Sequence, residues 1–152
     1  MTIAETVRPP SCAAPPRVMA GGGLAVRALH GGCGATTVAR LLGARESFAP
    51  GAVVVAAART NLRGAEGVRA MLADPPAGRV LLVLTADAPL GPPPPVRAAV
   101  LEAADLLAGV HLLPYVPLWR GSPATAATAT AKWRRAAEAL RAEAALAVDG
   151  FI

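Results

Sequence analysis

Lysine, cysteine and aromatic side chains are scarce in this chain of 152 residues. Of the 15 basic residues, Lys132 is the only lysine and the rest are arginine. The two cysteines, Cys12 and Cys33, fit neither a disulfide framework nor the spacing of a metal site. This scarcity excludes the disulfide-stapled and zinc-stabilised classes, and any chemistry that needs a lysine depends on one residue.

Long hydrophobic runs are also lacking. The longest apolar runs, residues 52–58 and 80–84, are far shorter than the about 20 residues that cross a bilayer. No charged stretch followed by an apolar one opens the chain, as it does in a signal peptide. We therefore expect no membrane span and a cytoplasmic, reducing environment.

The net charge of +5 would suit an acidic partner such as nucleic acid. The arginines are scattered, however, with Arg134 and Arg135 as the only adjacent pair. The sequence has no basic patch interleaved with aromatic residues, which is typical of proteins that bind single strands. A small basic DNA-associated accessory protein is therefore a secondary hypothesis.

Three regions follow one another along the chain. Residues 1–22 are rich in proline and glycine and predict a flexible arm. Residues 23–125 alternate between strand-like and helix-like segments and predict an α/β domain. Residues 126–149 carry a final helix that we expect to pack on this domain. The length agrees with a single globular unit.

Apolar runs and helical periodicity alternate regularly within the middle region. The runs predict strands at residues 24–29, 52–58, 79–85 and 110–114. The periodic segments predict helices at 36–44, from a cap at Asn61 to Pro75, at 96–108 and at 130–146. This order predicts a three-layer α/β/α domain like that of P-loop NTPases, with a small, mainly parallel sheet of about four strands joined by right-handed crossovers.

The segment "HGGCGATT" lies between the first expected strand and helix, where a phosphate-binding loop belongs. In such loops, backbone N–H groups cradle phosphates, a lysine neutralises their oxygens, and the following hydroxyl holds Mg²⁺. The candidate phosphate-binding or nucleotide-binding residues are His30, Gly31, Gly32, Cys33, Gly34, Ala35, Thr36 and Thr37.

Ala35 stands where the loop's lysine is expected. Its loss removes a charge-assisted bond to phosphate worth about 1.5–3 kcal/mol. Three interpretations remain open: binding of an anion or nucleotide without turnover, a glycine-rich turn that only packs closely, and hydrolysis by an unusual loop. Cys33 at a helix start could be reactive, although a small residue that fills a tight loop explains it equally.

The loop resembles the Lys-Gly-Gly-x-Gly-Lys-Thr-Thr loop of the ParA/MinD class of P-loop ATPases, with His30 and Ala35 in place of its two lysines. The segments "AVVVAAARTNLRGAEGVRAML", "RVLLVLTADAP" and "LLPYVPLWR" resemble the second half of that class. Only residues 44–51 separate the first helix from the second strand, too few for the switch I segment and Walker B strand. In an alternative register, "TADAPLG" supplies Walker B, with Asp87 as metal ligand.

From about residue 24 to 123 the chain most closely resembles an uncharacterised actinobacterial family of shortened P-loop proteins associated with conjugative and integrative elements. The shared features are the lysine-free loop, Arg59-Thr60 after a strand, the segment 86–89, and Pro117 with Trp119-Arg120. Tyr115 and Leu118 depart slightly from its pattern. The resemblance implies a fold and a context, and no established activity comes with it.

Several polar and aromatic side chains follow expected strand ends, where open parallel sheets bind ligands. These crevice candidates are Arg59, Thr60, Asp87, Trp119 and Arg120. An ion pair between Arg59 and Asp87, and a packing role for Trp119, are the alternatives. If an Mg-nucleotide binds, Thr36 and Asp87 are the expected metal ligands.

The sequence thus favours a non-catalytic, P-loop-like binding or assembly protein of a mobile element, with a protein partner. It would bind no cofactor, or else Mg-ATP or Mg-GTP without hydrolysis. The first alternative is a weak ParA/MinD-like ATPase or GTPase, and the second is the DNA-associated protein.

Overall fold

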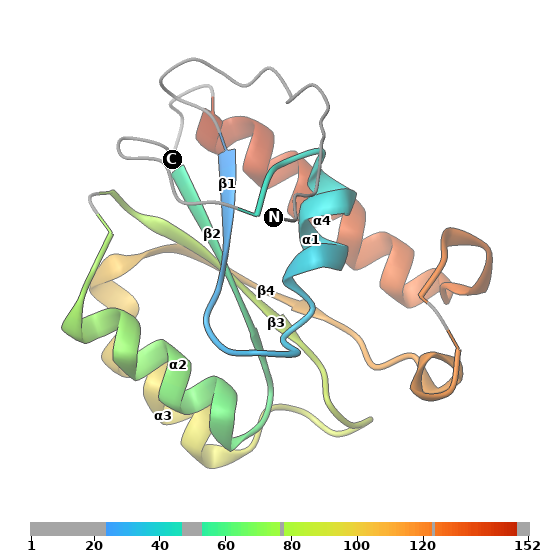
Figure 1. Ribbon diagram of the computed structural model, residues 1–152, viewed down its shortest axis with the longest axis horizontal. Helices are drawn as coiled ribbons and strands as arrows, with labels where there is room; N and C mark the ends of the chain where they lie inside the picture. The colour runs from blue at the N-terminus through green and yellow to red at the C-terminus, as the bar shows by residue number, and fades with distance from the viewer. Residues whose placement is uncertain (1–23, 47–52, 77, 123, 149–152) are drawn as a thin grey trace, which may run out of the picture.

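The computed structural model describes residues 24–46, 53–76, 78–122 and 124–148 (Figure 1). Strands and helices alternate along these residues. In chain order the elements are β1 (Leu24–Ala28), α1 (Ala35–Leu42), β2 (Val53–Arg59), α2 (Leu62–Ala73), β3 (Val80–Thr85), α3 (Pro94–Glu102), the short 3₁₀ helix η1 (Ala104–Leu106), β4 (Leu107–Leu113), η2 (Pro117–Arg120), η3 (Ala126–Thr128) and α4 (Ala131–Val148). The expected arm at 1–22 lies outside the described residues.

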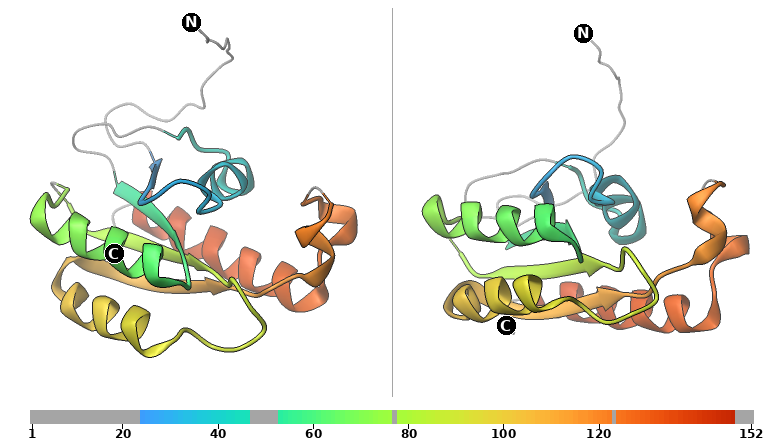
Figure 2. Two further views of the ribbon diagram at one scale, coloured as in Figure 1. Left: turned by 60° about the horizontal axis from the view of Figure 1, so that its bottom comes forward. Right: turned by 90° about the horizontal axis from the view of Figure 1, so that it is seen from below.

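The four strands form one parallel sheet in the order β1-β2-β3-β4. Strands β2 and β3 lie in the middle, and the described side chains of their apolar runs are buried on both faces. Such runs suit a parallel sheet covered by helices on both sides. Helices α1 and α4 cover one face and α2 and α3 the other, and Figure 1 shows the strands between these two pairs. Figure 2 shows the same elements from two further sides. The predicted α/β/α fold class is confirmed.

The connection from β1 to β2 differs from the two that follow in the face on which its helix packs. Each strand is added on the same side of the last, yet α1 packs on the face opposite α2 and α3. The rest of this connection, residues 47–52, lies outside the described residues, so its hand stays a prediction. The packing of Val38 and Ala39 against α4's face of the sheet fixes α1 in this position.

After α1 the chain passes first along the outer edge of β1. The backbone N–H of Val26 donates to the carbonyl of Arg45 at 2.8 Å, in an isolated parallel bridge. The N–H of Leu29 donates to Ala57 on β2. Because N–H groups alternate in direction along a strand, Arg45 lies on the edge of β1 away from β2. Within the described residues, the segment after α1 pairs with the outer edge of β1 at Arg45.

Helix α2 begins and packs as the sequence suggests. Asn61 caps it, since its Oδ1 accepts a hydrogen bond from the N–H of Gly64 at 3.0 Å. Gly64 also lets the helix approach the end of β2 closely, because a Cβ there would lie 1.8 Å from the carbonyl oxygen of Arg59. The cap and this glycine together set the position of α2 beside the sheet's carboxyl edge.

We expect Asn61→Ala to lower the free energy of unfolding by about 1 kcal/mol, because an N-terminal amide of α2 loses its partner. Urea unfolding followed by circular dichroism measures the change. Glu66→Ala, at an exposed position on the same helix, is the control and should change stability by less than about 0.5 kcal/mol. Equal stabilities of the two variants would contradict the capping role.

The boundary between α3 and β4 differs from the prediction. Helical spacing suggested a helix to about residue 108 and a strand from 110, but α3 ends at Glu102 and β4 starts at Leu107. Leu107 pairs with Val80 of β3, and burial in the sheet outweighs the helical tendency of the alanine- and leucine-rich segment.

Helix α4 closes the face of the sheet that α1 leaves open. Its buried side is Trp133, Ala137, Leu140, Ala144 and Ala147. The side chains of Glu143 and His111 of β4 are in hydrogen-bonding contact, and Nε of Arg141 donates to the carbonyl of Leu41 at the end of α1. None of the described helices is long and apolar enough to span a membrane.

Candidate functional site

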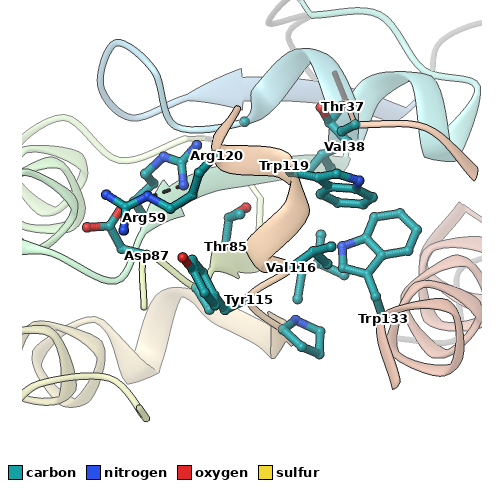
Figure 3. Close-up of a pocket in the computed structure, with 15 residues that line it drawn as sticks. Thr37, Val38, Arg59, Thr85, Asp87, Tyr115, Val116, Trp119, Arg120 and Trp133 are labelled. Carbon is teal, nitrogen blue, oxygen red and sulfur yellow. Dashed lines mark ion pairs between the residues drawn. The ribbon is translucent and has the colours of Figure 1, made fainter. Parts of the chain in front are cut away.

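A cavity of about 340 Å³ opens at the carboxyl edge of the sheet (Figure 3). It is bounded by the first turn of α1, by the residues that end or follow β2, β3 and β4, and by η2 and the start of α4. Its lining residues are Gly34, Thr37, Val38, Arg59, Thr85, Ala86, Asp87, Leu113, Pro114, Tyr115, Val116, Trp119, Arg120, Ala124 and Trp133. We call this cavity the crevice. Its size falls within the range of about 300–1,000 Å³ common for small-ligand sites.

The glycine loop runs from β1 into α1 at one wall of the crevice. Gly32 and Gly34 have φ angles of 71° and 88°, a left-handed conformation that favours glycine. Helix α1 starts at Gly34 without a side-chain cap, so the positive end of its dipole is not neutralised there. Cys33 and Ala35 point into the core. For Cys33 this placement supports a packing role.

His30 stands at the position of the first lysine in the ParA/MinD-type loop. Both nitrogens of its ring form hydrogen bonds with the backbone. The N–H of Arg59 donates to Nε2 at 3.0 Å, so Nε2 carries no proton. Nδ1 then carries the hydrogen and donates to the carbonyl of Gly31 at 2.9 Å. The ring is therefore the neutral tautomer, and both of its nitrogens are used in holding the loop to the end of β2.

Arg59 brings a positive charge to the loop. Its Nε donates to the carbonyl of Gly32 at 2.6 Å, and its Nη1 lies 3.6 Å from Oδ1 of Asp87. Thr60 is buried, and its hydroxyl accepts a hydrogen bond from the N–H of Asp87 at 2.8 Å. The loop and the segments after β2 and β3 are thus linked through one arginine and one threonine. The ion pair that the sequence offered as an alternative is present.

Thr85, the last residue of β3, presents a polar atom that lacks a partner. Its Oγ1 is buried without a hydrogen bond to the described residues. It faces the start of α1, since a Cβ built on Gly34 would lie 3.2 Å from this oxygen. Buried hydroxyls without partners are uncommon. Because Thr85 lines the crevice, a ligand there could supply the missing hydrogen bond.

Two tryptophans form the opposite end of the crevice from the charged side chains. Trp119 and Trp133 meet edge to face, with ring centroids 5.2 Å apart, and Nε1 of Trp119 donates to the hydroxyl of Thr128 at 2.7 Å. Figure 3 shows Arg59, Arg120 and Asp87 at one end, the indoles at the other, and Thr85 between them. The side chain of Arg120 makes no ion pair or hydrogen bond within the described part of the chain. The crevice therefore offers an aromatic end and a net positive end.

The structure brings together four of the five crevice candidates: Arg59, Asp87, Trp119 and Arg120 all line the cavity. Thr60 does not line the cavity, but its hydroxyl accepts a hydrogen bond from the backbone N–H of Asp87. Of the loop candidates only Gly34 and Thr37 line the crevice, whereas Gly31, Gly32 and Thr36 are exposed to solvent. Of the two expected metal ligands, Asp87 lines the crevice and Thr36 does not. The described residues contain no cluster of three His, Cys, Asp or Glu side chains that could bind a metal.

Sequence reasoning missed three polar or aromatic residues of the crevice: Thr85, Tyr115 and Trp133. Thr85 ends an otherwise apolar strand, a signal that could have identified it. Trp133 faces inward from α4, but nothing in the sequence pairs it with Trp119. Lys132 is exposed on α4 and does not line the crevice.

Comparisons with protein-family models, with curated proteins and with solved structures found no match to this chain.

Proposed function

We propose that this chain is a P-loop-like binding protein that holds a phosphate-bearing ligand, such as a nucleotide, in the crevice without hydrolysing it. The observation that carries the proposal is the lining of the crevice. Two arginines, the uncapped start of α1 and the buried hydroxyl of Thr85 converge on one cavity of ligand size. Guanidinium groups and helix N-termini are favourable partners for phosphate.

The chemistry of the crevice supports binding more than turnover. Ala35 is buried and offers no charge, and Lys132 lies elsewhere. Asp87 is the one acidic side chain that lines the crevice, and it faces Arg59 at ion-pair distance. Neither a lysine nor an unpaired carboxylate of the described residues is thus in place to stabilise a transferring phosphoryl group or orient a water molecule.

The resemblance to shortened P-loop proteins gives this binding role a context. We propose that the chain acts as an assembly or accessory component of the transfer or maintenance machinery of a mobile element, with a protein partner. A weak ATPase or GTPase is the second candidate, favoured by the presence of Thr37 and Asp87 in the crevice.

Calorimetric titration with Mg-ATP and Mg-GTP, together with a phosphate-release assay, tests the proposal. We expect saturable binding of at least one nucleotide, with no phosphate release above that of buffer, since the loop lacks its lysine. Phosphate release that is abolished in Thr36→Ala would show instead a working, unusual P-loop. The absence of binding would show that the ligand of the crevice is neither nucleotide.

A further inference from the structure

A second hollow, of about 310 Å³, adjoins the crevice between α1 and α4. Four residues line both cavities: Thr37, Trp119, Ala124 and Trp133. The two hollows therefore meet at the tryptophan pair. We call the combined surface the groove.

The groove is strongly basic. Arg40, Arg134 and Arg141 line the second hollow, and Arg59 and Arg120 line the crevice. The groove's acidic residues are Asp87 and Glu138, so five arginines face two carboxylates. The arginines come from α1, from the end of β2, from η2 and from α4. Residues that are scattered singly in the sequence thus gather around the two tryptophans in space.

Most of the guanidinium N–H groups in the groove donate no hydrogen bond to the described residues. Arg134 and Arg141 each donate to a backbone carbonyl, of Ala129 and Leu41 respectively. A guanidinium has five N–H donors, so these bonds hold each group in place and leave further donors for a ligand. Arg40 and Arg120 have no ion pair or side-chain hydrogen bond to the rest of the described chain. The groove can therefore contact anionic groups at several positions along its length.

The tryptophan pair lies between the two sets of arginines. Trp133 is largely buried at 9% exposure, whereas Trp119 is partly exposed and held by Thr128. A fixed, partly exposed indole flanked by arginines is the arrangement on which proteins stack bases while they contact the neighbouring phosphates. An acidic peptide would match the charge, but the carboxylate side chains that carry its charge have no aromatic face to stack on the indole.

From this geometry we infer that the ligand of the groove is a short single-stranded nucleic acid, with phosphates held on both sides of Trp119 and a base stacked on it. The inference rests on the proposed function, because the crevice would hold one phosphate of the same strand. It extends that function by naming a ligand longer than a mononucleotide. The inference also assigns a role to the arginines of the groove, whose clustering is not visible in the sequence.

Intrinsic fluorescence provides a direct test, because the chain has two tryptophans and both lie in the groove. The full chain is titrated with an oligothymidylate of about ten nucleotides, with an abasic oligomer of the same length, and with a glutamate-rich peptide of the same charge. We expect the oligothymidylate to quench the fluorescence and to bind at least about tenfold more tightly than ATP. The abasic oligomer should bind more weakly, and the peptide should not compete. Equal binding of all three probes would overturn the inference.

Matched variants locate the contact. Arg134→Ala should weaken oligonucleotide binding about fivefold and lower the salt dependence by about one released ion. Arg135→Ala removes the same charge from an exposed neighbour outside the groove and should leave binding unchanged. Trp119→Leu should abolish binding and Trp119→Phe should retain most of it. Identical affinities of the two arginine variants would show that the oligonucleotide does not bind in the groove.

The two proposals fail in different ways. Nucleotide binding that depends on Arg120, with no gain for the oligomer and no effect of Arg134→Ala, overturns the single-strand inference and leaves the proposed function standing. Failure of every nucleotide and oligonucleotide to bind overturns both.

Discussion

Gly64→Ala is expected to unfold the domain. A Cβ at this position would lie 1.8 Å from the carbonyl oxygen of Arg59 and 2.9 Å from its carbonyl carbon. These are backbone atoms of a central strand, which cannot move aside as a side chain can. The first turn of α2 would have to shift away from the sheet, which would uncover Ala65 and Val68 in the core. We expect a loss of more than about 4 kcal/mol, an exceptional value for one methyl group.

Thermal and urea unfolding measure this loss. Gly78→Ala is the matched control, because a Cβ there meets nothing within 4 Å. It should leave stability unchanged or raise it slightly, since alanine restricts the unfolded chain. A Gly64→Ala variant as stable as Gly78→Ala would show that α2 does not approach β2 this closely.

Arg120→Ala is expected to lower nucleotide affinity at least tenfold while the domain stays as stable as before. Arg120 lines the crevice, is exposed, and has no partner in the described part of the protein, so its removal leaves no buried group unpaired. A charge-assisted bond to phosphate is worth about 1.5–3 kcal/mol, and about 1.4 kcal/mol corresponds to a factor of ten.

Calorimetric titration with the nucleotide that the wild-type chain binds measures the loss, and Arg135→Ala again serves as the control. Unchanged affinity in Arg120→Ala, with the fold intact, would place the phosphate outside the crevice. Arg59 is less suitable for this test because it also holds the glycine loop through Gly32.

The fold class could be predicted from the sequence because its signals are local. Buried apolar runs define β2 and β3, and the cap at Asn61 defines the start of α2. The face on which α1 packs could not be predicted, because it depends on contacts with α4, about a hundred residues away. The start of β4 was missed because the segment before Gly109 has helical composition and only its pairing with β3 makes it a strand.

The crevice could be predicted in part by a topological rule, since residues after parallel strands meet at one edge. That rule identified Arg59, Asp87 and Arg120. It could not identify Trp133, which arrives from α4, or the second hollow, whose arginines lie on two helices. It also could not show that His30 is used to hold the loop, because that role depends on the N–H of Arg59 across the sheet.

A structure of the protein with a bound nucleotide tests the central claim most directly. We predict that the phosphates lie in the crevice, between the guanidinium groups of Arg59 and Arg120, with the hydroxyl of Thr85 donating to one of their oxygens. A nucleotide wrapped instead by the backbone amides of residues 31–36, with Mg²⁺ on Thr36 as in an active P-loop, would contradict the account.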